Sequence, residues 1–149
     1  KKIIRALVRI KMGKQKNLFL GNLDSKRDWG HARDYVEAMW KILQQKKPDD
    51  YVIATGKQFS IRQFINLVSK KLDINIVWKG KGLNEKGYDT ATKKNIVLID
   101  KNYIRPLDVK TLLGNANKAR KKLSWKPKTN IHQLIEEMIS EEVSILDVE

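Results

Sequence analysis

The sequence predicts an α/β fold in which strands and helices alternate and pack in layers. Stretches with apolar residues at three- and four-residue spacing recur along the chain, and short apolar runs lie between them. No internal repeat or low-complexity segment breaks this alternation. The length of 149 residues suits a single domain with one modest core.

The first half of the chain alternates between the two types of element. The expected elements, in order, are a helix over 3–12, a strand over 18–20, a turn-rich stretch over 22–30, a helix over 31–45 and a buried strand over 51–54. Gly13 and Gly56 are expected to end the first helix and the second strand. On the later of the two helices, we expect Trp40 to be buried and Asp34 and Glu37 to be exposed.

The second half begins and ends with an amphipathic helix. Ser60 opens a helix, and Gln63 three residues later completes a capping box. Asn130 is the expected N-cap of the last helix, and Phe64 and Trp125 are expected in the core. Between these helices we expect strands over 74–78 and 96–99, a loop rich in Gly and charge over 79–94, and a short basic helix over 115–123.

Composition excludes several kinds of site. The chain has no Cys, so disulfides and Cys-ligated zinc are excluded. His31 and His132 are far apart, and neither has a second His or a carboxylate at a familiar metal spacing, so we expect no metal. No apolar run approaches the roughly 20 residues of a membrane span. We therefore expect a cytoplasmic protein with no membrane partner.

The first residues indicate a piece of a longer protein. The chain lacks an initial Met and opens with Lys1-Lys2-Ile3-Ile4, which already has a helical pattern. No Gly-rich dinucleotide loop follows a strand, and no Walker loop or Gly-x-Ser-x-Gly elbow occurs. We therefore expect no self-contained catalytic machinery in these residues.

The charge balance favours an anionic partner. The net charge is +14, from 31 Lys and Arg against 17 Asp and Glu, which suits nucleic acid, an acidic membrane surface or a phosphorylated ligand. Lys supplies most of the excess, and we interpret the bulk of it as solvated surface. The most basic cluster lies on the short helix over 115–123 and consists of Lys118, Arg120, Lys121 and Lys122.

Four blocks of sequence, in order, resemble one enzyme family. The most specific is Arg27-Asp-Trp-Gly-His-Ala32, inside a longer matching string over 20–40. The others are Val52-Ile-Ala-Thr-Gly56, then Arg105-Pro-Leu-Asp-Val109 with Leu112-Leu-Gly114, and finally Lys118-Ala119 with Leu123-Ser-Trp-Lys-Pro127. These blocks resemble the GDP-mannose 4,6-dehydratases of the extended short-chain dehydrogenase/reductase superfamily, and the resemblance covers nearly the whole chain.

The resemblance implies an activity for a longer enzyme. Residues 1–149 would be its C-terminal, substrate-binding α/β subdomain, with most of the NAD(P)-binding Rossmann domain outside the chain. The family converts GDP-mannose to GDP-4-dehydro-6-deoxymannose, on the way to GDP-fucose and other deoxyhexoses. A bound NADP takes hydride from C4 of the sugar, water leaves across C5 and C6, and hydride returns to C6. The resemblance also implies a homo-oligomer when full length.

The same resemblance implies which functional residues lie within residues 1–149 and which lie in the N-terminal part of the longer enzyme. The catalytic residues and the NADP site of the family lie in the missing N-terminal part. We therefore assign no catalytic or cofactor-binding residue here, and we expect the chain alone to be inactive. What carries over is nucleotide-sugar binding, on Lys2, Arg27, Arg105 and Asp108.

Each of these residue types suits its implied role. Arg27 and Arg105 match arginines used on the GDP moiety, and a planar, permanently charged guanidinium suits a diphosphate. Asp108 stands where the family has a Glu that accepts from ribose hydroxyls. Because Asp is one methylene shorter, either the backbone lies closer or the contact is weaker or water-mediated. Lys2 matches a Lys near the substrate.

Other interpretations of these residues stay open at this point. Arg27 could instead pair with Asp24 or Asp28, and Arg105 could pair with Asp108. For the whole chain, a basic nucleic-acid-binding module is the alternative from a different class. The aromatic residues do not alternate with basic residues on strands, which argues against it. A third hypothesis is an epimerase or reductase of the same superfamily, which the Trp-Gly-His string disfavours.

Overall fold

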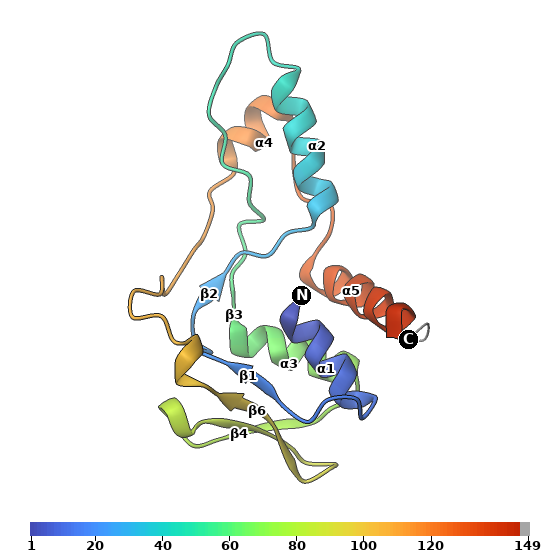
Figure 1. The fold of residues 1–149 in the computed structure, drawn as a ribbon. Helices are drawn as coiled ribbons and strands as arrows, with labels where there is room; N and C mark the ends of the chain where they lie inside the picture. The colour runs from blue at the N-terminus through green and yellow to red at the C-terminus, as the bar shows by residue number, and fades with distance from the viewer. Residues whose placement is uncertain (147–149) are drawn as a thin grey trace.

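The computed structural model describes residues 1–146 and shows a small sheet with helices on one of its faces (Figure 1). Helices α1 (Lys2–Lys11) and α3 (Ile61–Lys71) cover that face, and α5 (Ile131–Leu146) packs against both of them. A second group of elements extends away from this body and contains α2 (Ala32–Leu43) and α4 (Asn117–Leu123), which pack against each other. The predicted α/β class is confirmed.

The larger sheet has the strand order β1-β6-β5-β4. Its strands are β1 (Leu18–Leu20), β4 (Ile76–Lys79), β5 (Lys86–Asp89) and β6 (Lys94–Ile99). Strand β1 runs parallel to β6, whereas the pairs β5–β6 and β4–β5 are antiparallel. The strands expected near 18–20, 74–78 and 96–99 are therefore confirmed, with small shifts at their ends.

The loop expected over 79–94 is wrong, because β5 and a 3-10 turn at Gly82–Asn84 lie within it. The Gly residues and charges of this stretch had favoured a loop. Gly87 instead allows two strands to pack closely, since a Cβ there would lie 2.9 Å from Cβ of Val97 on the neighbouring strand. A glycine in a strand commonly marks such a close approach.

The main hydrophobic cluster fills the space between the sheet, α1, α3 and α5. Ser60 and Gln63 form the expected capping box at the start of α3. Asn130 caps α5 as predicted, because its Oδ1 accepts from the backbone N–H groups of His132 and Gln133 at 2.9 and 3.1 Å. The buried members of the main cluster include Leu7, Leu18, Phe64, Ile65, Val68, Val97 and Ile135.

A second, smaller cluster lies between α2 and α4 and contains the buried Trp125. Gly114 lies close to segment 51–54, since a Cβ on Gly114 would lie 2.1 Å from Cβ of Ala54. Two short strands, β2 (Lys26–Arg27) and β3 (Phe59–Ser60), form an antiparallel ladder where the chain passes between the two clusters. The expected burial of Trp125 and Phe64 is confirmed.

The expected burial of Trp40 is wrong, since its side chain is 62% exposed. Val36, Met39 and Leu43 are exposed on the same helix. Helix α2 turns Ala38, with Tyr35 and Ile42, toward the small cluster instead. Helix α4 packs against α2 in that cluster, and the rest of the broad apolar stripe of α2 stays exposed.

The buried strand expected over 51–54 forms no ladder with any of residues 1–146. A strand needs a neighbouring backbone as partner, and within residues 1–146 the backbone N–H groups of this segment donate to no acceptor. Ala54 is buried, whereas Val52 is half exposed. The segment 51–54 therefore keeps a strand-like sequence without a sheet to join.

Asp34 was expected on an exposed face and is instead buried. One carboxylate oxygen, Oδ2, accepts from the backbone N–H groups of Lys128 and Thr129 at 3.1 and 3.0 Å. The Asp34 carbonyl accepts from the indole N–H of Trp125 at 2.8 Å. Asp34 thus fixes α2 to the segment between α4 and α5. Glu37 is not fully exposed either, because it forms ion pairs with Lys41 and Lys128.

Replacing Asp34 by Ala tests this connection. The substitution leaves two partly buried backbone N–H groups without their acceptor, so we expect the free energy of unfolding to fall by about 1 kcal/mol. Urea unfolding of both proteins measures the change. Asp50→Ala, at an exposed Asp, is the matched control and should change stability little. Equal stability of Asp34→Ala and the control would contradict this role.

Candidate functional site

The structure brings Arg27 and Asp108 together from segments far apart in sequence. Arg27 lies on β2, and its Nη2 is 2.8 Å from Oδ1 of Asp108. The other carboxylate oxygen, Oδ2, accepts from the hydroxyl of Ser25 at 2.5 Å. Both side chains of the ion pair are one-quarter exposed, so the pair lies at the surface but is partly shielded from water.

Backbone contacts hold the Asp108 segment against β2. The N–H of Lys26 donates to the carbonyl of Lys110 at 2.8 Å, and the N–H of Leu112 donates to the carbonyl of Lys26 at 3.2 Å. Arg27 adds a hydrogen bond from Nη1 to the carbonyl of Val109 at 2.7 Å. Residues 105–112 are therefore anchored beside β2, the strand that carries Arg27.

Arg27 keeps donors for a ligand. Its Nη1 donates to the carbonyls of Lys26 and Val109, and its Nη2 donates to Asp108. A guanidinium has five N–H donors, so Nε–H and one Nη2–H have no acceptor among residues 1–146. These internal bonds fix the direction of the guanidinium before any ligand arrives.

Arg105 lies one turn before Asp108, whose N–H donates to the Arg105 carbonyl at 3.1 Å. Its side chain is exposed and forms no hydrogen bond or ion pair with any of residues 1–146. Arg105 therefore does not form an ion pair with Asp108, which pairs with Arg27 instead. The Arg105 guanidinium remains available to an anion.

Lys2 lies apart from this group. Its Nζ is 3.6 Å from the ring centroid of Tyr103, in the 3-10 turn Lys101–Tyr103 that precedes Arg105. Lys2, Tyr103, Arg5 and Arg9 all border a surface hollow of about 460 Å³. No contact joins Lys2 directly to the Arg27–Asp108 pair among the described residues.

The two acidic neighbours of Arg27 in sequence are engaged elsewhere. Asp24 pairs with Arg62, with Nη2 and Oδ1 2.9 Å apart. Asp28 accepts from the backbone N–H groups of Thr55 and Gly56 at 3.1 and 2.8 Å. Both residues therefore hold neighbouring segments in place instead of neutralising Arg27.

Ser25 belongs to the candidate site, although the sequence alone did not single it out. It is buried, and its hydroxyl donates to Asp108. Ser25 stands two residues before Arg27, and residues spaced by two lie on the same side of an extended segment. That spacing was the available signal, but it has meaning only once Asp108 is known to lie opposite.

Asp108 is held in its charged form. The Ser25 hydroxyl lowers the pKa of Asp108 most, and the positive charges of Arg27 and Arg105 lower it further. An ionised carboxylate is an acceptor only, with lone pairs left on each oxygen after the bonds from Ser25 and Arg27. Asp108 can therefore still accept from the hydroxyls of a diol.

The basic helix α4 is largely occupied by contacts within the chain. Lys118 and Lys122 both pair with Asp49, whose pKa they lower to about 2. Arg120 donates to the carbonyl of Thr55 at 3.3 Å. This leaves little of the cluster free for a nucleic-acid backbone, and the nucleic-acid hypothesis is not favoured.

Residues 1–146 contain neither a metal-binding cluster nor a membrane-spanning helix. No group of three or more His, Asp or Glu side chains lies close enough together there to hold a metal ion. Within that range, every helix is too short or too polar to cross a membrane.

Comparison with known proteins identifies the family that this chain matches. Residues 1–138 match the profile of the GDP-mannose 4,6 dehydratase family. A GDP-mannose 4,6 dehydratase of Dictyostelium discoideum is 49% identical over 146 residues, which cover 98% of this chain and 41% of the relative. The human GDP-mannose 4,6 dehydratase is 44% identical, with 98% and 39% covered. The chain thus spans about two fifths of the length of these relatives.

Solved structures agree on the fold. The RMD protein of Pseudomonas aeruginosa, solved with NADPH, gives a TM-score of 0.75 at 20% identity, covering 96% of this chain and 41% of that one. A dTDP-glucose 4,6-dehydratase of Bacillus anthracis, solved with NAD, gives 0.71 at 17% identity, with 97% and 39% covered. A UDP-glucose 4-epimerase of Bifidobacterium longum gives 0.67 at 16% identity, with 95% and 39% covered. At these identities the likeness extends to the fold alone.

The ionisation of Asp108 gives a testable prediction. Because the pKa of Asp108 is lowered, its ionised form stabilises the fold fully above the ordinary Asp pKa of about 3.9, and this contribution is lost as the pH falls through the lower pKa of the folded state. Ser25→Ala removes the main cause and should raise the pKa, as followed by NMR titration of the Asp108 carboxyl carbon. Arg105→Gln should raise it less. An unchanged titration in Ser25→Ala would refute the assignment.

Proposed function

The chain belongs to the GDP-mannose 4,6 dehydratase family, and we propose that it is the C-terminal, GDP-sugar-binding portion of such an enzyme. The complete protein would convert GDP-mannose to GDP-4-dehydro-6-deoxymannose. The observation that carries this proposal is the convergence of Arg27, Asp108 and Arg105 at one surface. They supply two guanidinium groups and one ionised carboxylate there, and family membership favours a GDP-sugar as their ligand.

The proposed contacts follow from the donors and acceptors of Arg27, Arg105 and Asp108 that are not used in hydrogen bonds within the chain. Arg27 offers its two remaining N–H groups to the diphosphate from a fixed position, whereas the exposed Arg105 closes over the nucleotide from the adjacent segment. Asp108 accepts from the ribose hydroxyls while it keeps Arg27 in place. The shorter Asp is therefore compensated by Ser25 and Arg27, which hold its carboxylate at the surface. Lys2 is proposed to face the sugar end.

The cofactor is proposed to bind outside these residues. When bound, NADP supplies the hydride that leaves and rejoins the sugar. No Gly-rich loop follows a strand in this sequence, so we assign no NADP contact to this chain. Its own residues bind and orient the nucleotide, which holds the sugar for chemistry performed by groups elsewhere in the protein.

The remainder of the enzyme is proposed to cover the outward face of α2. Val36, Met39, Trp40 and Leu43 are exposed there at 60–80% of their surface. Segment 51–54, which lacks a ladder partner, follows that helix in sequence. A helix followed by a strand is the unit that extends a parallel sheet, and the relatives carry more than half of their length outside the matched region. A cytoplasmic homo-oligomer remains our expectation for the whole protein.

The activity itself is tested with two proteins. The complete gene product, supplied with NADP and GDP-mannose, should form the 4-dehydro-6-deoxy sugar nucleotide, as followed by chromatography of the nucleotide sugars. The 149-residue chain alone should form none, because the hydride carrier and the general base are absent. Turnover by the chain alone would overturn the proposed division, and no turnover by the complete protein would overturn the proposed activity.

The binding residues are tested by GDP titration calorimetry on the complete protein. Arg27→Ala and Arg105→Ala each remove a charge-assisted contact worth about 1.5–3 kcal/mol. GDP binding should therefore weaken by roughly ten- to a hundredfold. Arg→Lys should recover only part of this loss, because the planar fork is gone. Asp108→Asn should weaken binding less, because a neutral oxygen still accepts from a hydroxyl.

The matched control is Arg33→Ala, since Arg33 is an exposed Arg on α2 that pairs with Glu137. It should leave GDP binding unchanged. If both Arg27→Ala and Arg105→Ala also bind GDP like the unaltered protein, the site assignment is wrong even though the family remains.

A further inference from the structure

We propose that Arg62 is a positioning residue for nucleotide-sugar binding: it fixes the segment 22–27 so that Arg27 is held toward the ligand. This inference rests on the proposed function. Arg62 does not touch Arg27 or Asp108, and its influence passes through Asp24 and the backbone between Asp24 and Arg27.

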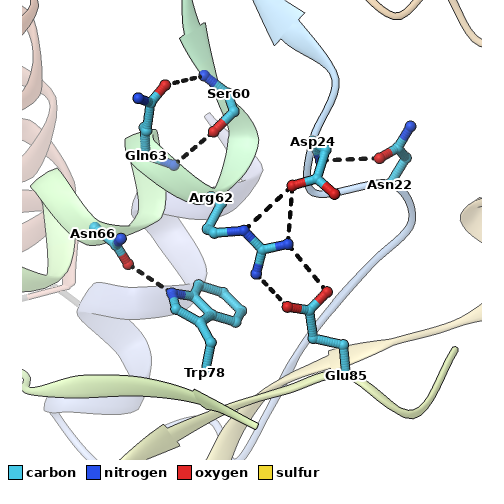
Figure 2. Close-up of polar contacts among 8 residues, drawn as sticks. All are labelled: Asn22, Asp24, Ser60, Arg62, Gln63, Asn66, Trp78 and Glu85. Carbon is cyan, nitrogen blue, oxygen red and sulfur yellow. Dashed lines mark hydrogen bonds and ion pairs between the residues drawn. The ribbon is translucent and has the colours of Figure 1, made fainter. Parts of the chain in front are cut away.

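The Arg62 side chain is surrounded on several sides (Figure 2). Its guanidinium binds both carboxylate oxygens of Glu85, through Nη1 to Oε1 and through Nη2 to Oε2 at 3.1 Å. Nε and Nη2 both donate to Oδ1 of Asp24, at 3.3 and 2.9 Å. Cζ of Arg62 lies 4.8 Å from the ring centroid of Trp78. Asp24 is itself held within its loop, because its own N–H donates to Oδ1 of Asn22 at 2.9 Å.

This cluster is more than a surface ion pair. The side chain of Arg62 is 23% exposed and that of Glu85 is 15% exposed. Trp78 is itself fixed, because its indole N–H donates to Oδ1 of Asn66 at 3.0 Å. The partners come from the loop before β2, from the residue just before β5 and from β4, so Arg62 joins three segments at the N-terminal end of α3.

Backbone hydrogen bonds also join the start of α3 to the segment that leads to Arg27. The N–H of Arg62 donates to the carbonyl of Leu23 at 2.9 Å, and the N–H of Ile61 donates to the carbonyl of Ser25 at 3.1 Å. Ser25 then donates from its hydroxyl to Asp108. The segment 22–27 is therefore held by Arg62 at one end and by Asp108 at the other. If the Arg62 contacts are lost, segment 22–27 is held less firmly. The Arg27 guanidinium can then take orientations in which it does not bind the diphosphate.

Lys could not replace Arg62 in this arrangement. A guanidinium presents donors along two edges and a flat face, which here meet Glu85, Asp24 and Trp78 together. An ammonium is a compact charge that can pair with one carboxylate but cannot satisfy this geometry. We therefore expect Arg62→Lys to preserve folding better than it preserves ligand binding.

The experiment compares GDP affinity in the complete gene product by calorimetry. Arg62→Gln and Asp24→Asn should each weaken GDP binding by roughly three- to tenfold, which lies in the lower part of the range of couplings between residues of one hydrogen-bonded network. Asp24 is largely exposed, so Asp24→Asn should fold normally even if Arg62→Gln does not. Lys71→Gln is the matched control, because it removes an ion pair to Glu136 from the other end of α3. It should leave GDP affinity unchanged.

A double-mutant comparison separates positioning from a general structural role. If Arg62 acts through Arg27, then adding Asp24→Asn to Arg27→Ala should weaken GDP binding no further. Hydrogen exchange of the amides of 22–27 should rise in Asp24→Asn and not in Lys71→Gln.

The outcomes distinguish this inference from the proposed function. If Arg27→Ala weakens GDP binding but Asp24→Asn and Arg62→Gln do not, Arg62 has no positioning role and the binding site stands. A positioning role is likewise excluded if Asp24→Asn weakens binding equally with and without Arg27. If Arg27→Ala itself has no effect, the proposed site fails and the inference about Arg62 fails with it.

Discussion

The short ladder between β2 and β3 is the contact on which the arrangement of this chain depends. The ladder pairs Lys26 with Ser60 and Arg27 with Phe59, where the chain leaves the main cluster for the smaller one and returns. The same stretch of β2 also bridges to Thr111 on the later passage. Three passages of the chain are thereby aligned side by side, and Arg27, Ser60 and Asp108 each take their position from that alignment.

The sequence alone was informative wherever the determining contacts are local. The capping box of Ser60 and Gln63 and the N-cap at Asn130 use partners within three residues, and both are present as expected. The role of Gly87 was not predicted because it depends on Val97, which lies across a ladder that composition does not reveal. Trp40 was placed wrongly for a similar reason: a helical pattern shows that a face is apolar, but not which part of that face another element covers.

In the candidate site too, the sequence indicated single residues but not the contacts between distant segments. Family motifs singled out Arg27, Arg105 and Asp108 one by one, but they did not indicate that Arg27 and Asp108 pair with each other. These residues are 81 positions apart, and their pairing follows from the passage of 105–112 along β2. The nearer acidic neighbours, Asp24 and Asp28, looked equally suitable in sequence. They are excluded because Arg62 and the turn at Thr55 and Gly56 engage them.

The smaller cluster has a consequence for how such a protein can change over generations. Its residues come from two separate stretches, around Tyr35–Ile53 and around Ala116–Trp125, and the stretch between them builds much of the main cluster. No single break in the gene separates the two clusters into intact halves. A single crossover with a related gene between residues 54 and 115 would therefore divide both clusters. Inheritance is expected to keep the candidate site around Arg27 and the outward face of α2 as one unit.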